Sequence, residues 1–265
     1  MVPEEGYDGP GRFVLAAPGH GKFASAPPVE LTYFAIRGLG QLAQLCLEVA
    51  GHPYRYTVVT GPYFSEHLKP KLVFGRLPCV TAPDGTEIVQ SKAVLRYVAR
   101  LCGLGGKSDS EFARCDMLHE LLQSEGKLDE AEIKKLEGRS SLGEVGDLKS
   151  TSLRATMDHS EAEKTCAALK FWEDAAGRST TGWLLGGLGD GKAGGLCFVD
   201  LALYWTLRPH VAILDQLGCA ALVKFVGAVR GQPGVARLVD SGRMMPDMRA
   251  GYLYQGDDLC PAPGA

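Results

Sequence analysis

The chain has 265 residues, of which 45% are hydrophobic and 22% are charged, and its formal net charge is −3. This length allows one large domain or two ordinary ones. The small negative charge argues against a surface that binds nucleic acid or an anionic membrane. No apolar run approaches the roughly 20 residues that a membrane helix needs. We therefore expect neither a membrane span nor a nucleic-acid partner.

The eight cysteines and six histidines are scattered along the chain, and they form neither a C-x-x-C pair nor an H-E-x-x-H motif. Such spacing is not typical of a disulfide framework or of a zinc site. We expect reduced, mostly buried thiols in a cytoplasmic protein, and no metal. Residues 1–28 contain glycine and proline but no apolar core of a secretory signal, so we expect a disordered tail there.

Strand and helix patterns alternate from residue 30 to about residue 106. The expected elements are strand 30–36, helix 40–50, strand 54–59, a polar loop over 60–76, strand 79–82, strand 86–90 and helix 91–101. Pro83-Asp84-Gly85 is a tight turn signal, so the last two strands are expected to form an antiparallel hairpin.

Only helical spacing is visible from about residue 110 onward. The expected helices are 111–136, 157–176, 198–216 and 219–230. The layout predicts a small α/β domain over residues 29–106, followed by a larger all-helical domain over 107–265 with a loop insertion near 137–152.

The turn after the first strand, Gly38-Leu-Gly40-Gln-Leu-Ala43, matches the G-x-G-x-x-A pattern of a dinucleotide site. Such a site needs parallel strands and an acidic residue at the end of the second strand. Here the second strand ends in Val58-Val59-Thr60, and the next two strands form a hairpin. We therefore interpret Gly38 and Gly40 as turn and helix-start glycines. Two further glycine matches within 186–194 are interpreted as a loop.

Two later motifs are candidates for binding an extended, carboxylate-bearing ligand. A cis Leu77-Pro78 bond would turn the chain and free the N–H and C=O groups of Leu77; an edge proline without a ligand is the alternative. Ser91 is predicted to be the N-cap of helix 91–101, whose first N–H groups suit a carboxylate, with the Gln90 amide beside it. Plain helix capping is the alternative for this pair.

With Tyr33 on the first strand added to these motifs, the chain resembles a cytosolic glutathione transferase of the tyrosine type, most like the sigma class. The stretches that carry the resemblance are LTYFAIRG, FGRLPCV, DGTEIVQSKAVLRYVAR and GGLCFVDLALYW. The resemblance implies an α/β plus all-α protein, with a thioredoxin-like N-terminal domain followed by an all-helical C-terminal domain. It also implies that the Cys197-Phe-Val-Asp200 stretch occupies a helix-capping box in which sulfur replaces the usual hydroxyl.

The resemblance implies that Tyr33 is catalytic, because its hydroxyl would donate a hydrogen bond to the glutathione sulfur and lower the pKa of the thiol. Glutathione would be the co-substrate, held by Tyr33, Lys69, Arg76, Leu77, Pro78, Gln90 and Ser91. The second substrate would be a small hydrophobic electrophile, in a pocket walled by Ile36 and Leu39.

Several positions depart from the family pattern. Leu39 stands where a second arginine often supports the thiolate, and Gln123 stands in place of the partner-subunit aspartate. The aromatic residue that usually caps glutathione would fall on Phe64 or Ser65.

A homodimer is expected, in which the basic face of helix 91–101 meets an acidic helix of the partner. The charged residues are Lys92, Arg96 and Arg100 on one side and Glu111, Asp116, Glu120 and Glu125 on the other. The leading interpretation is a glutathione transferase. The alternatives are a glutathione-dependent isomerase or peroxidase on the same site, or a catalytically weakened binding or structural protein.

Overall fold

The structure is a computed structural model of the chain that describes residues 11–124, 126–142, 160–187, 194–241 and 243–245. It divides into two compact units. Within the described residues, the first unit holds 11–104 together with 232–245, and the second holds 105–231. Among the described helices, none is long and apolar enough to cross a membrane.

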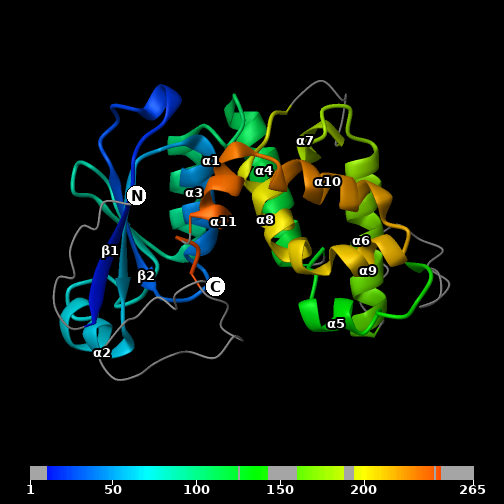
Figure 1. The fold of residues 1–265 in the computed structure, drawn as a ribbon, viewed down its shortest axis with the longest axis horizontal. Coiled ribbons are helices and arrows are strands. Elements are labelled where there is room, and N and C mark those ends of the chain that lie inside the picture. The colour runs from blue at the N-terminus through cyan, green and yellow to red at the C-terminus, as the bar shows by residue number, and fades with distance from the viewer. Residues whose placement is uncertain (1–10, 125, 143–159, 188–193, 242, 246–265) are drawn as a thin grey trace. The chain divides into compact units, whose positions relative to one another are not determined.

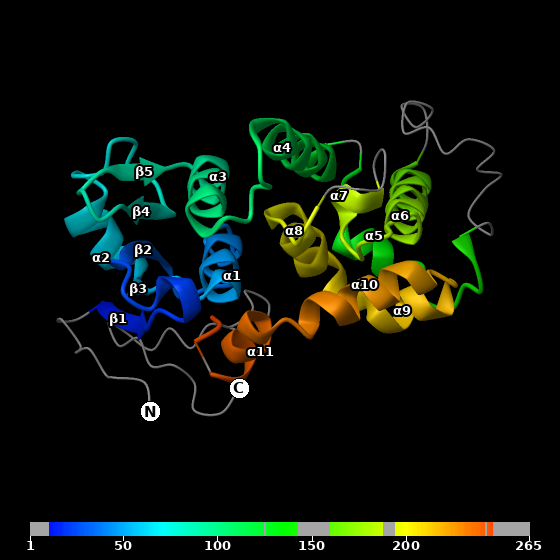
Figure 2. The same ribbon diagram turned by 90° about the horizontal axis from the view of Figure 1, so that it is seen from above.

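A five-stranded sheet organises the first unit, with strand order β1-β3-β2-β4-β5. The strands are β1 (Arg12–Ala17), β2 (Val29–Phe34), β3 (Tyr54–Val59), β4 (Cys79–Thr81) and β5 (Glu87–Val89). β2 and β3 are parallel, and the other neighbours are antiparallel. The helices α1 (Gln41–Ala50), α3 (Ser91–Cys102) and α11 (Pro233–Asp240) gather beside the sheet (Figure 1, Figure 2). The β-α-β start, hairpin and closing helix confirm the thioredoxin-like layout.

Side chains along β2 alternate between the two faces of the sheet, and this alternation determines which of them are buried in the core. Val29 and Leu31 are fully buried and Tyr33 is 5% exposed, whereas the residues between them are half-buried. Because successive side chains of a strand point to opposite faces, Tyr33 lies on the same face as the two aliphatic residues. The polar loop over 60–76 contains the short helix α2 (Gly61–Tyr63) and one π-helical turn, Phe64–Leu68.

Residues 11–28 differ from the disordered tail expected over 1–28. Arg12–Ala17 form β1, which pairs antiparallel with β3 from Arg12 opposite Val59 to Ala17 opposite Tyr54. The physical reason is that β3 would otherwise present an unpaired edge, and the apolar FVLAA sequence can cover it. The Glu30 carboxylate links the neighbouring strands, since it accepts from the Thr57 hydroxyl at 2.6 Å and lies 3.8 Å from the Arg12 guanidinium. Residues 1–10 lie outside the described part of the chain.

The described residues of the second unit form helices, with no strand among them. The helices are α4 (Asp109–Gln123), α5 (Glu130–Lys134), α6 (Glu161–Gly177), α7 (Leu184–Gly187), α8 (Phe198–Leu207), α9 (Val211–Gln216) and α10 (Ala220–Arg230). α4 packs on α8, and α10 packs on both α6 and α8. The helical C-terminal domain is therefore confirmed for these residues, and most of the expected insertion at 137–152 lies outside them.

Two expected helices are each broken in the structure. The 111–136 helix divides into α4 and α5, because Asp129 starts a new helix by accepting the N–H groups of Ala131 and Glu132. The 198–216 helix divides into α8 and α9 at Pro209, which cannot continue the hydrogen-bond ladder of a helix.

The C-terminal part of the expected 107–265 domain also differs from the observed structure. Helix α11 was not anticipated, and it packs on α1 in the first unit. The boundary expected at residue 106 lies close to the observed one after residue 104, but the chain returns to the first unit from residue 232.

A buried carboxylate fixes the start of α8. Asp200 is fully buried, and its carboxylate accepts the N–H groups of Leu184 and Cys197, each at 2.8 Å. The Cys197 thiol donates to the same carboxylate at 3.0 Å. The expected capping box is therefore present with sulfur in place of a hydroxyl. Burial raises the pKa of Asp200 to about 6 despite these donors.

Cys197→Ser is expected to raise the free energy of unfolding by up to about 1 kcal/mol, because a hydroxyl forms stronger cap hydrogen bonds than a thiol. Denaturant unfolding of both proteins measures the change. Asp200→Ala is the opposing control, and it should cost about 1–3 kcal/mol because buried donors lose their acceptor. A Cys197→Ser protein less stable than the wild type would show that burial of the sulfur outweighs the cap.

Candidate functional site

The sheet brings the three sequence motifs to one edge. Cys79, the first residue of β4, pairs with Thr32 of β2 on one side and with Val89 of β5 on the other. Tyr33 follows Thr32, Leu77-Pro78 precede Cys79, and Gln90-Ser91 follow Val89. Since β4 is antiparallel to both neighbours, its start lies beside their ends. The tyrosine, the proline bond and the start of α3 therefore meet at the same edge.

The glycine turn before α1 encloses the Tyr33 ring. A Cβ atom on Gly38 would lie 2.6 Å from the Tyr33 hydroxyl oxygen, and one on Gly40 would lie 2.8 Å from the ring carbon Cγ. Both distances are too short for a real contact, so only glycine fits at these two positions. The interpretation of Gly38 and Gly40 as turn and helix-start residues is compatible with this geometry, but sequence reasoning missed their contact with the tyrosine.

The Tyr33 hydroxyl has a partner inside this turn. The Leu39 N–H donates to the Tyr33 oxygen at 3.1 Å. Burial raises the pKa of Tyr33 above its ordinary value, and the Leu39 N–H opposes that shift only in part. Tyr33 therefore stays protonated at neutral pH. Its oxygen already accepts one bond, and its own proton is available to a negatively charged atom.

The Leu77-Pro78 peptide bond is cis, as expected. Pro78 is buried and Leu77 is half-buried, whereas the neighbouring Arg76 is exposed. Leu77-Pro78 directly precede β4, which pairs with β2 next to Tyr33.

The start of α3 differs from the expectation by one residue. Gln90 is the N-cap and Ser91 is the first helical residue, so the prediction of Ser91 as the N-cap is wrong. Gln90 has a positive φ of 75°, which is uncommon for a residue other than glycine and often marks a functional position. Gln90 makes no side-chain cap bond, so the first N–H groups of α3 lack that partner.

The loop over 60–76 supplies exposed cations near the same strands. Lys69 and Arg76 are both exposed, and the Lys69 side chain packs against Gly75, where a Cβ atom would meet it at 3.1 Å. Phe64, one of two candidates for the aromatic cap, instead packs edge-on against Phe34 at 5.3 Å between ring centroids.

Two further expectations concern the second substrate and the partner subunit. Leu39 is 63% exposed and Ile36 is half-buried, and both belong to the turn that follows β2. Gln123 is the exposed last residue of α4, and Glu125 lies outside the described residues.

The cysteines and a group on α4 are further side chains with reactive or metal-binding atoms. The seven described cysteines are all buried free thiols. Within the described residues, Asp116, His119 and Glu120 place their potential metal-ligand atoms within 4.8 Å of one another. All three belong to a single helix, and their spacing places them on one face of it.

Comparisons with known proteins agree with this geometry. Residues 29–100 match the family model described as the glutathione S-transferase N-terminal domain. A glutathione S-transferase P from Caenorhabditis elegans is 40% identical over 95 residues, which is 36% of this chain and 45% of the relative. A hematopoietic prostaglandin D synthase from Gallus gallus is 35% identical over 92 residues, which is 35% of this chain and 45% of that protein. The chain thus spans about half the length of the curated relatives it matches.

Solved structures extend the likeness to the helical part. A glutathione S-transferase from Ascaris lumbricoides superimposes with a TM-score of 0.61 at 24% identity, over 83% of this chain and 98% of the other. A monomeric glutathione S-transferase from the hookworm Necator americanus gives 0.58 at 22% identity, over 84% and 100%. The chain therefore has the glutathione S-transferase fold. Its first domain is a glutathione S-transferase N-terminal domain, which confirms the resemblance to cytosolic glutathione transferases, while the sigma class stays a prediction.

Gly40→Ala is expected to destabilise the protein by about 1–3 kcal/mol, because the new methyl group overlaps the Tyr33 ring. Gly227→Ala in α10 is the matched control, since nothing lies within 4 Å of the added carbon. That change should stabilise by about 0.5–1 kcal/mol through helix propensity. Denaturant unfolding measures both. Equal effects of the two changes would refute the tight fit of Tyr33 in its turn.

Proposed function

We propose that this protein is a glutathione transferase in which the thiolate of glutathione attacks small hydrophobic electrophiles. The observation that carries the proposal is the Tyr33 hydroxyl, which accepts the Leu39 N–H and keeps its own proton to donate. A thiolate is the nucleophile in such reactions, and a hydrogen bond to the charged form lowers the thiol pKa. The sulfur forms a bond to the electrophilic carbon, the leaving group departs with its electron pair, and the thiol proton passes to solvent.

The proposed glutathione contacts follow from the shared sheet edge. The backbone of Leu77, beside Pro78, would hold the cysteinyl part as an added strand. The first N–H groups of α3, with Gln90 and Ser91, would hold the γ-glutamyl carboxylate. The exposed cations Lys69 and Arg76 would face the glycine carboxylate. Ile36 and Leu39 would contact the electrophile, since both stand in the apolar turn beside Tyr33.

A glutathione-dependent isomerase on the same site is the second candidate. The similarity to a prostaglandin D synthase supports it, because that protein is named for a prostaglandin product. Parallel assays separate the two functions: conjugation of an aryl halide for a transferase, and glutathione-dependent formation of prostaglandin D for an isomerase. Glutathione binding without either reaction would favour the binding or structural protein that Leu39 and Gln123 suggest.

A cytoplasmic homodimer is also part of the proposal. Val73, Phe74 and Met117 are 68%, 61% and 58% exposed, and exposed apolar side chains of this size often belong to interfaces. Met117 lies on α4, the helix expected to carry the acidic side of the interface.

Tyr33→Phe should raise the pKa of bound glutathione and lower turnover at neutral pH by about 10- to 100-fold, the value of one hydrogen bond to a charged group. Glutathione affinity should change little, and activity should recover at higher pH as the unassisted thiol ionises. Steady-state kinetics across pH measure these effects. Tyr63→Phe in α2 is the matched control and should leave turnover unchanged. Unchanged turnover in Tyr33→Phe would remove the tyrosine from the mechanism.

Sedimentation of the wild-type protein should give twice the chain mass of 28.3 kDa. Phe74→Ser should shift the protein toward a monomer and weaken glutathione binding, because the partner chain is proposed to complete the site. Leu39→Ser, which removes an apolar side chain of similar exposure, should leave the mass unchanged. A wild-type monomer with full glutathione affinity would contradict the dimer.

A further inference from the structure

Helix α1 carries a stripe of buried polar side chains. Gln41 and Gln44 are fully buried, and Glu48 is only 3% exposed. Their spacing of three and four residues places them on one face of the helix. Buried polar groups are costly unless they have partners, and a buried carboxylate most of all. Gln41 donates to Gln44, and Tyr54 of β3 contacts both Gln44 and Glu48. The other partners come from residues 232–241 and 243–245, which we call the C-terminal segment.

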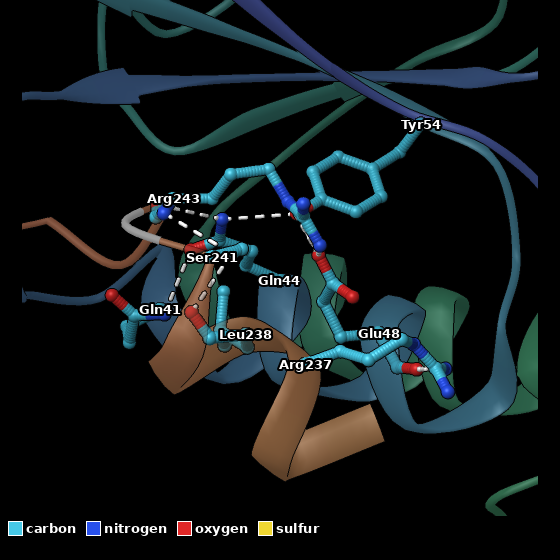
Figure 3. A network of polar contacts seen from close by, with 8 residues as sticks. All are labelled: Gln41, Gln44, Glu48, Tyr54, Arg237, Leu238, Ser241 and Arg243. Atoms are coloured by element: carbon cyan, nitrogen blue, oxygen red, sulfur yellow. Dashed lines mark hydrogen bonds and ion pairs between the residues drawn. The ribbon is translucent and has the colours of Figure 1, made fainter. Parts of the chain in front are cut away.

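The C-terminal segment lies directly on α1 (Figure 3). At its start, a Cβ atom on Gly234 would lie 2.2 Å from the Glu48 carbonyl oxygen, so only glycine permits this approach. Arg237 donates to that same carbonyl at 2.9 Å. These two contacts anchor α11 near the C-terminal end of α1.

An ion pair forms the centre of the network. The Arg243 guanidinium donates to the Glu48 carboxylate through Nε at 2.9 Å and through Nη2 at 2.6 Å. The Tyr54 hydroxyl donates to the same oxygen at 2.7 Å. Burial works against the charge on Arg243, but the adjacent carboxylate overrides it and raises the pKa of the guanidinium. The guanidinium therefore keeps its charge, and this ion pair lies inside the first unit.

The same segment continues to the turn that encloses Tyr33. Gln44 donates to the backbone carbonyl of Arg243 at 3.2 Å, and Gln41 donates to Gln44 at 2.7 Å. On the other side of the turn, the Arg37 side chain donates to the backbone carbonyl of Met245. Residues 243–245 thus contact Arg37 directly before the turn and Gln44 in the first turn of α1 after it.

We propose that Arg243 is a positioning residue for Tyr33: by anchoring the C-terminal segment to Glu48, it holds the Gly38–Gly40 turn so that the Leu39 N–H meets the Tyr33 hydroxyl. The expected effect of Arg243 on catalysis rests on the proposed transferase function. The Leu39 bond polarises the tyrosine hydroxyl and thereby strengthens the bond that this hydroxyl donates to a thiolate. A residue 210 positions from Tyr33 in the sequence therefore adjusts the acidity of the bound thiol.

The first test needs no glutathione. Amide hydrogen exchange of Leu39 is measured in the wild type, in Arg243→Met and in Arg243→Lys. Arg243→Met should increase the exchange of Leu39 about tenfold or more, because the turn opens more often once its anchor is lost. Arg243→Lys keeps the charge but not the two-pronged geometry, and it should restore part of the protection.

The second test uses the bound co-substrate. The pKa of bound glutathione, followed by the ultraviolet absorbance of its thiolate, should rise by about half a unit to one unit in Arg243→Met. Turnover at neutral pH should fall by about three- to tenfold, in proportion to the thiolate fraction, with little change in KM for glutathione. In a Tyr33→Phe background, Arg243→Met should produce no further shift, since the proposed route passes through the tyrosine hydroxyl.

Arg237→Met is the matched control. It removes an arginine of the same segment that donates to the Glu48 backbone carbonyl and not to its carboxylate. It should lower the midpoint of thermal unfolding and leave Leu39 exchange and the thiol pKa unchanged. If Arg243→Met leaves Glu48 unpaired and fails to fold, the double variant Glu48→Gln with Arg243→Met removes both buried charges and carries the same expectations.

The possible outcomes distinguish the positioning role of Arg243 from the proposed transferase function. Unchanged Leu39 exchange in a folded Arg243 variant overturns the inference, whatever the pKa of bound glutathione. Increased exchange in Arg243→Met and normal exchange in Arg237→Met support it. A wild-type protein that shows no bound thiolate overturns the transferase function, while the exchange result still decides whether Arg243 positions the turn.

Discussion

The first unit depends on one constraint: the Tyr33 ring is buried, and its hydroxyl oxygen must still have a partner. The Leu39 N–H meets that need at 3.1 Å. For this bond to form, the chain must pass so close to the ring that neither Gly38 nor Gly40 can carry a side chain. The turn also sets where α1 begins, because Gln41 N–H bonds back to the Gly38 carbonyl. The same turn therefore fixes both the position of the tyrosine and the start of the helix.

In the described part of each unit, a deeply buried carboxylate joins distant segments. Glu48 joins α1 to Tyr54 and to Arg243, and Asp200 joins the start of α8 to Leu184. A buried charge is strongly destabilising when its partner is missing. Such groups therefore act as selective anchors, since only a segment that brings the right donors can pack over them. In the first unit that segment is the C-terminal one, which is how residues beyond 232 come to pack with residues 11–104.

The sequence predicted most of the thioredoxin-like domain because its signals are local. Strand 54–59 was predicted at its observed bounds, and helix 91–101 differs by one residue at its end. A tight turn predicts the hairpin, and a run of β-branched and aromatic residues predicts β2. The N-cap of helix α3 is wrong by one residue, and the largest error falls where strand pairing is long-range. The prediction of a tail at β1 is wrong because its partner, β3, lies about 40 residues further along the chain, and a short apolar run carries no periodic signal of its own.

The sequence by itself supplied the residues of the candidate site. Strand, proline and helix-start patterns drew attention to Tyr33, the Leu77-Pro78 bond and the Gln90-Ser91 pair, and the resemblance to glutathione transferases implied their roles. The tertiary structure alone decided how that site is supported. The roles of Gly38 and Gly40, the Leu39 N–H and the Arg243 anchor follow from contacts between backbone and side chains. Glu48 and Arg243 are 195 residues apart, and a pattern within a few residues of sequence cannot predict a hydrogen bond across that separation. These polar residues hold the turn only because they are buried next to their partners, and burial is a property of the folded chain.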